Sequence, residues 1–92
     1  NPLTVDYKST TADSADNQMD IIVYDTAGST VSLTGTSTDL ASTSWTNTQL
    51  SFGSATWTPG SEFTIVFRTF AKSDNEMHLG SVQLRYEELP VE

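Results

Sequence analysis

An acidic segment near the start of the chain holds the side chains best suited to bind a metal ion. Residues 13–20 read DSADNQMD, so Asp13, Asp16 and Asp20 offer three carboxylates beside an amide oxygen. Calcium takes roughly six to eight oxygen ligands of these kinds. The segment lacks the D-x-D-x-D-G spacing of helix-loop-helix calcium sites, and Asp and Asn are also common turn residues. Two interpretations stay open: calcium on these three aspartates, or a solvated turn without any cofactor.

Both tryptophans, Trp45 and Trp57, lie in the stretch TSWTNTQLSFGSATWTPG, residues 43–60. A flat exposed Trp can stack on a sugar, whereas a packed Trp can close one end of a sandwich. Trp45 is out of phase with Leu50 and Phe52, the apolar side chains of the segment that follows it. We therefore predict that Trp45 caps an edge of the fold and does not serve as a platform.

Trp57 precedes a Pro-Gly turn, and its role stays open between packing, ligand binding and a subunit interface. Sugar sites combine an exposed aromatic with a few polar groups that form hydrogen bonds. The residues that would form such a site here are Trp57, Tyr24 and Asn47.

Catalysis is the chemistry that the sequence supports least. The chain has one histidine, His78, and no cysteine, so it offers no thiol nucleophile. Twelve acidic residues always allow some pair for glycoside hydrolysis, but 92 residues leave little room for both a core and a substrate cleft. We expect a protein that is not an enzyme.

The charge of the chain limits its partners. Four basic and twelve acidic residues give a net charge of −8. Nucleic acids and anionic membranes are bound mainly through Lys and Arg, so neither is an expected partner. The sequence also has no apolar stretch long enough to span a membrane.

The alternation of apolar and polar residues indicates which strands position the candidate side chains. Apolar residues recur at every second position, as in Leu3, Val5 and Tyr7, and no helical period of useful length occurs. The expected strands are residues 3–9, 20–25, 30–35, 46–52, 62–71 and 77–89. We predict an all-β antiparallel β-sandwich of six to seven strands, with jelly-roll or Greek-key connections.

Two local features follow from the same pattern. Residues 20–25 are apolar on both faces and predict a central strand that forms a hairpin with residues 30–35 around Gly28. The alternation in residues 77–89 slips by one at Gly80, which predicts a β-bulge. Residues 1–92 are expected to be a single domain, and the start at Asn1 instead of methionine leaves open a fragment of a longer protein.

The order of features in residues 44–86 resembles small jelly-roll modules. A tryptophan precedes a strand at residues 44–46, a Pro-Gly turn at 59–60 leads into the aromatic strand 63–67, and Gly-x-Val-x-Leu follows at 80–84. Similar modules occur in bacteriophage fibre, decoration and capsid-appendage proteins, and among carbohydrate-binding modules. The resemblance implies a fold more directly than a function.

For function, the resemblance implies a non-catalytic structural or interaction module of a virus particle, such as a capsid decoration or fibre domain. Its location would be the virion, and its partners would be further copies of itself or other virion proteins. The alternative is a carbohydrate-binding module of a secreted or cell-surface protein, which would be extracellular and bind a surface glycan.

Overall fold

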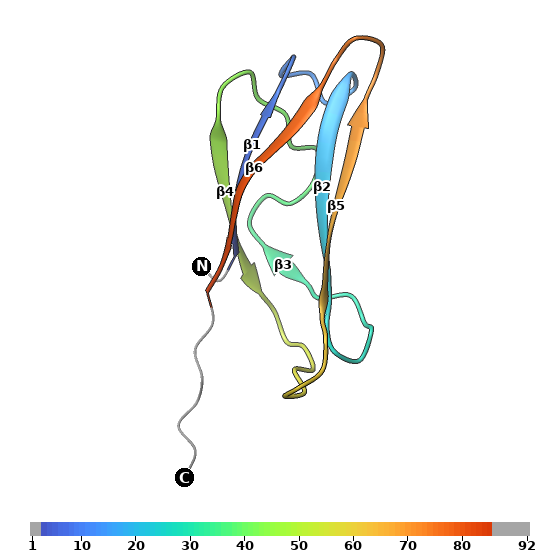
Figure 1. Cartoon of the computed structure of the whole chain (residues 1–92), viewed down its shortest axis with the longest axis vertical. Helices are drawn as coiled ribbons and strands as arrows, with labels where there is room; N and C mark the ends of the chain where they lie inside the picture. The colour runs from blue at the N-terminus through green and yellow to red at the C-terminus, as the bar shows by residue number, and fades with distance from the viewer. Residues whose placement is uncertain (1–2, 86–92) are drawn as a thin grey trace.

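The computed structural model describes residues 3–85, which form a sandwich of two antiparallel sheets (Figure 1). Four strands form one sheet in the order β3-β4-β1-β6, here called the β1 sheet, and β2 pairs with β5 in the β2 sheet. The strands are β1 (Leu3–Ser9), β2 (Asn17–Tyr24), β3 (Leu33–Thr34), β4 (Thr46–Phe52), β5 (Thr64–Ala71) and β6 (Met77–Leu84).

The predicted all-β sandwich is thus confirmed. The six strands of the described residues are fewer than the roughly eight of a jelly roll, so the structure shows a β-sandwich and no finer class. The last strand ends at Leu84 and is shorter than predicted. Residues 86–89 of that predicted strand lie outside the described residues.

The centre of the β1 sheet follows the predicted alternation. Leu3 and Val5 of β1 are fully buried and Tyr7 nearly so, while the residues between them face outward. β1 pairs with β4 on one side and with β6 on the other. A strand with neighbours on both sides and one apolar face buries that face against the opposite sheet.

The predicted hairpin of residues 20–25 and 30–35 is only partly right. Its turn forms, because the Asp25 amide donates to the Ser29 carbonyl at 2.8 Å and the Val31 amide donates to the Val23 carbonyl at 2.8 Å. The chain then leaves β2, and β3 pairs with β4 in the other sheet. β5 is the only strand of the described residues that pairs with β2, and the other edge of β2 carries isolated bridges to Leu40 and Thr30, so β2 does not lie between two strands as predicted.

The predicted bulge at Gly80 is confirmed by the register of β1 and β6. Val5 pairs with Val82, but Tyr7 pairs with Leu79, so Asp6 faces one extra residue on β6. The bulge keeps the apolar side chains of β6 on the inner face on both sides of Gly80.

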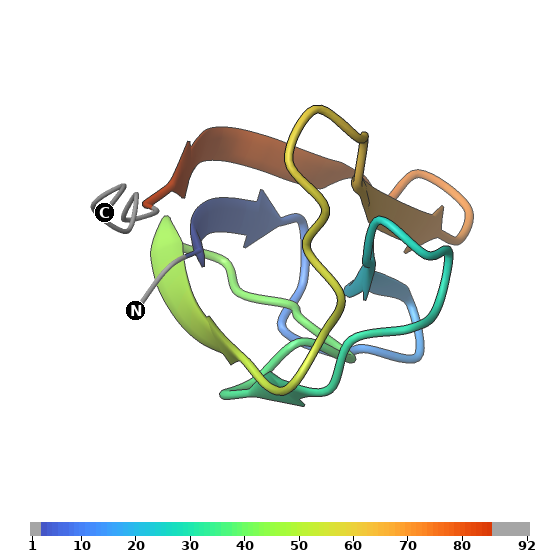
Figure 2. The same cartoon turned by 90° about the horizontal axis from the view of Figure 1, so that it is seen from below.

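The core lies between the two sheets and is covered unequally. On one side β3 and the loops around it close the sandwich, and Val31 and Leu40 are buried there. On the other side run β5 and β6, each the last strand of its sheet (Figure 2). The inner face of β6 remains accessible there, with Leu79 43%, Val82 41% and Leu84 36% exposed. We call this surface the open side.

Candidate functional site

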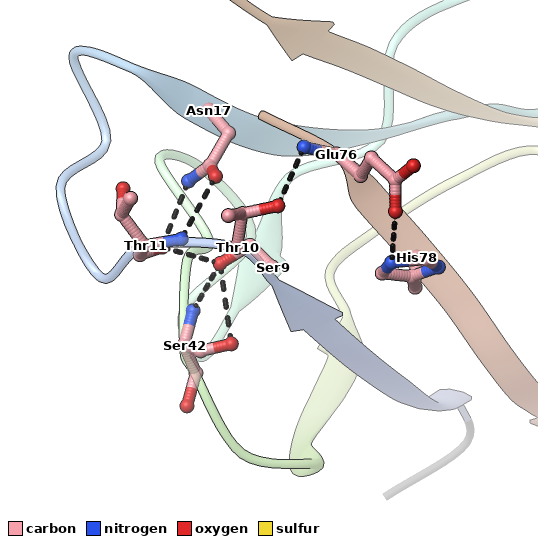
Figure 3. Close-up of polar contacts among 7 residues, drawn as sticks. All are labelled: Ser9, Thr10, Thr11, Asn17, Ser42, Glu76 and His78. Carbon is pink, nitrogen blue, oxygen red and sulfur yellow. Dashed lines mark hydrogen bonds and ion pairs between the residues drawn. The ribbon is translucent and has the colours of Figure 1, made fainter. Parts of the chain in front are cut away.

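The acidic segment folds into a turn that uses its own polar groups. Asn17 is fully buried, and Figure 3 shows its amide facing Thr11. Its Oδ1 accepts from the Thr11 amide at 3.1 Å, and its Nδ2 donates to the Thr11 carbonyl at 2.9 Å. Asp13 Oδ1 accepts from the Ala15 amide at 2.9 Å. Asp and Asn therefore act here as turn formers.

Further hydrogen bonds fasten this end of the sandwich (Figure 3). The Ser42 amide donates to Ser9 Oγ at 2.7 Å, which ties the end of β1 to the segment before β4. The Glu76 amide donates to Thr10 Oγ1 at 2.8 Å, which ties β1 to the β5–β6 loop. His78 Nε2 lies 3.2 Å from Glu76 Oε2 in a pair that is exposed on both sides.

The three aspartates proposed as calcium ligands are not brought together. Among residues 3–85, no group of three or more His, Cys, Asp or Glu side chains could hold a metal ion. Asp20 Oδ2 forms a salt bridge with Arg68 at 2.9 Å, and its Oδ1 accepts from the Asp39 amide at 2.9 Å. Asp16 lies in the turn before β2. Asp13 and Asp20 instead serve separate structural contacts, so calcium on Asp13, Asp16 and Asp20 stays a prediction from the sequence.

Asp25 is a structural carboxylate that the sequence does not single out. Its Oδ1 accepts from the amides of Ala27 and Ser29 at 3.0 and 2.9 Å. Its Oδ2 accepts from the Thr56 amide at 3.0 Å, and Thr56 belongs to the loop after β4. The Thr26 amide also donates to the Thr56 carbonyl at 3.0 Å. One carboxylate therefore clamps two loops at one end of the sandwich, and we call it the Asp25 clamp.

The Asp25 clamp makes the stability of the fold depend on pH in the acid range. Backbone amides, that of Thr56 first and that of Ser29 next, lower the pKa of Asp25 below its ordinary value of 3.8. The Asp39 amide and then Arg68 lower the pKa of Asp20 in the same way. A lowered pKa in the folded state gives stability that is fully present above the unfolded value and is lost as the pH falls through the folded value.

We therefore expect thermal stability to decline below about pH 4. The change Asp25→Asn should lower the melting temperature at pH 7 by several degrees and flatten its dependence on pH in the acid range. Melting curves followed by circular dichroism between pH 2 and 7 measure both effects. Asp74→Asn in the exposed β5–β6 loop is the control, and an equal effect of the two variants would contradict the clamp.

The candidate ligand residues Trp57, Tyr24 and Asn47 do not form one site. Trp57 stacks on Phe52 with ring centroids 5.7 Å apart and meets the edge of Phe63 at 5.4 Å. Tyr24 ends β2 in one sheet, whereas Asn47 lies on β4 in the other. Trp57 thus packs into an aromatic cluster beyond the ends of the strands, although 43% of it stays exposed.

Trp45 is placed differently from its prediction. It is 57% exposed, the largest exposed fraction among the large apolar side chains of the described residues. Its ring lies over Gly80 of β6, and a Cβ on Gly80 would come within 2.7 Å of Trp45 Cζ3. The prediction of an edge plug is wrong, because Trp45 continues the outward phase of Asn47 and lies on the outer face of the β1 sheet.

Comparison with family models, curated proteins and solved structures finds no match for this chain. The resemblance to bacteriophage and carbohydrate-binding modules therefore stays a prediction from the sequence. Within residues 3–85, no helix is long and apolar enough to cross a membrane. Two surfaces remain as candidate sites: the open side and the outer face around Trp45.

Proposed function

We propose that this chain is a non-catalytic interaction module that assembles with a second copy of itself through the open side. The supporting observation is that Leu79, Val82 and Leu84 face the inside of the sandwich but stay 36–43% exposed. Each lies opposite a buried residue of β1, so these side chains belong to the core face and not to the outer surface. Burying them against another chain would remove apolar surface from water.

The strands that border the open side favour a protein partner. β6 pairs only with β1, so no strand of the described residues is hydrogen-bonded to its other edge. Edge strands are commonly protected by charged side chains or proline. Residues 79–84 of β6 read LGSVQL and contain neither, although the bulge at Gly80 bends the strand.

The charge distribution favours a second copy in particular. The chain carries a net charge of −8, but residues 63–71 and 77–85 contain no Asp or Glu. Two acidic molecules can therefore approach through the open side without placing carboxylates against each other. Antiparallel pairing of β6 with its own copy would also satisfy the two-fold symmetry of most homodimers.

The test compares two neighbouring positions on β6. Val82→Lys places a charge on the open side, and its long side chain can still reach solvent from this half-exposed position. Gln83→Lys places the same charge on the outer face and is the matched control. Sedimentation velocity should show a dimer for wild type and Gln83→Lys, and an at least tenfold higher dissociation constant for Val82→Lys. Circular dichroism should show the same fold in all three.

A wild-type chain that stays monomeric up to millimolar concentration would overturn the proposed self-assembly. So would a Val82→Lys variant that dimerises as tightly as wild type. The setting of this assembly in a virus particle, as a decoration or fibre domain, is supported by the sequence resemblance alone.

A further inference from the structure

We propose that the outer face of the β1 sheet around Trp45 binds a neutral pyranose sugar that stacks on the indole. This site is separate from the open side, since it lies on the opposite face of the same sheet. It also differs from the sugar site predicted from the sequence, because it is built on Trp45 and not on Trp57.

The position of the indole is the first observation that supports this site. Trp45 directly precedes β4, and its ring reaches Gly80 on β6. β1 lies between those two strands, and neighbouring strands are about 4.8 Å apart. The side chain therefore reaches across β1 over the outer face of the sheet. More than half of Trp45 stays exposed there, so part of its ring is accessible to a ligand.

Gly80 makes this position of the indole possible. A side chain there would meet not only the Trp45 ring but also Asp6 Cβ at 3.2 Å. The positive-φ glycines of the described residues are Gly28, Gly35 and Gly60, so Gly80 is not required by a left-handed backbone. Its missing side chain leaves the space that the indole occupies. The bulge and the glycine together make room for an exposed aromatic side chain on an otherwise polar face of the sheet.

The neighbours of Trp45 supply hydrogen-bonding groups suited to hydroxyls. Asn47 Nδ2 donates to Asp6 Oδ1 at 2.8 Å, which fixes both side chains and leaves Asn47 Oδ1 and Asp6 Oδ2 outside this hydrogen bond. Asn47 follows Trp45 by two positions on the same face, about 7 Å along the strand. That spacing suits a sugar ring that stacks on the indole and directs its hydroxyls toward the amide and the carboxylate.

The charges on this face indicate the class of sugar. Lys8 lies opposite His78 in the register of β1 and β6, and His78 is paired with Glu76. Asp6 adds a carboxylate next to the indole, and the whole chain is acidic. Anionic sugars such as uronic or sialic acids would be repelled, whereas neutral hexoses meet both donors and acceptors here.

Trp57 differs from Trp45, because among the described residues it packs against other aromatic rings and Trp45 does not. Trp57 is held between two phenylalanine rings, as expected of a side chain that closes a core. Described aromatic ring contacts involve Trp57 and not Trp45. The exposed face of the Trp45 ring is therefore not needed to complete the aromatic packing.

The experiment follows the two indole N–H signals of the wild-type chain by two-dimensional NMR. They are assigned with Trp57→Phe, which retains Trp45 alone. Cello-, manno- and laminari-hexaose are the neutral probes, and oligogalacturonate is the anionic control. We expect at least one neutral probe to shift the Trp45 signal with a millimolar or tighter dissociation constant, with little change at Trp57.

Two variants complete the test. Trp45→Ala should weaken binding of that probe at least tenfold, which corresponds to about 1.4 kcal/mol. Gly80→Ala keeps the tryptophan but displaces its ring, and it should weaken binding severalfold. No shift with any neutral probe, a shift confined to Trp57, or full binding by folded Trp45→Ala would each overturn the proposal. Loss of dimerisation in Trp45→Ala without sugar binding would identify this face as a protein interface instead.

Discussion

Truncation of Leu50 to alanine is expected to lower the free energy of unfolding by about 2–5 kcal/mol. Leu50 is fully buried on β4 and lies opposite Leu3, which is also fully buried. The change removes apolar contacts and leaves a cavity that the rigid pair of sheets cannot close. Small domains have only about 5–15 kcal/mol of stability, so this one substitution consumes much of it.

The measurement is urea unfolding at micromolar concentration, where self-association is least. Leu79→Ala is the matched control, because it deletes the same atoms from a side chain that is 43% exposed on the open side. It should cost about 1 kcal/mol. If both variants lowered the free energy of unfolding of the monomer by the same amount, this would contradict the greater exposure of the core on the open side.

Gly35→Ala is the second substitution with a large expected effect. Gly35 follows β3 with φ of +115°, a conformation that is strained for any residue with a side chain. A Cβ at this position would also collide with the backbone carbonyl oxygen of Gln49 on β4. Backbone strain alone costs about 1–3 kcal/mol. We expect the total loss to exceed that range, since the collision must also push β3 away from β4.

Gly28→Ala is the control that separates the cost of backbone strain from the cost of the collision. Gly28 also has a positive φ, of +85°, but a Cβ there would meet no atom within 4 Å. The control should therefore show the conformational cost alone, about 1–2 kcal/mol. If thermal unfolding gives the same loss for both variants, the close approach of Gly35 to β4 is not the decisive contact.

Local patterns were sufficient to predict the elements of this fold but not their partners. The alternation of Leu3, Val5 and Tyr7 depends only on neighbouring positions, so it correctly identified a strand and its buried face. The slip at Gly80 likewise indicated the bulge. The pairing of β3 with β4 instead of β2 depends on contacts between distant segments, which no local pattern contains.

The same limit explains the errors about individual side chains. The phase of Trp45 disagrees with that of Leu50 and Phe52 and so predicts an edge position, yet that phase is the one that faces outward. The Trp45 ring lies over Gly80, a residue 35 positions away in the sequence. The Asp25 clamp joins residues 31 positions apart, and only the folded chain brings them together. Asp13, Asp16 and Asp20 are close in the sequence, whereas strand β2 carries Asp20 toward Arg68.

The shortness of β3 has a consequence for how far an assembly through β6 could grow. The β1 sheet ends in β6 on one side and in β3, only two residues long, on the other. If two copies join through β6, the continuous sheet that results is bounded at both ends by β3. A two-residue edge offers too few backbone groups to recruit a third strand. Pairing through this sheet would therefore be self-terminating, with a defined stoichiometry of two instead of an open fibre.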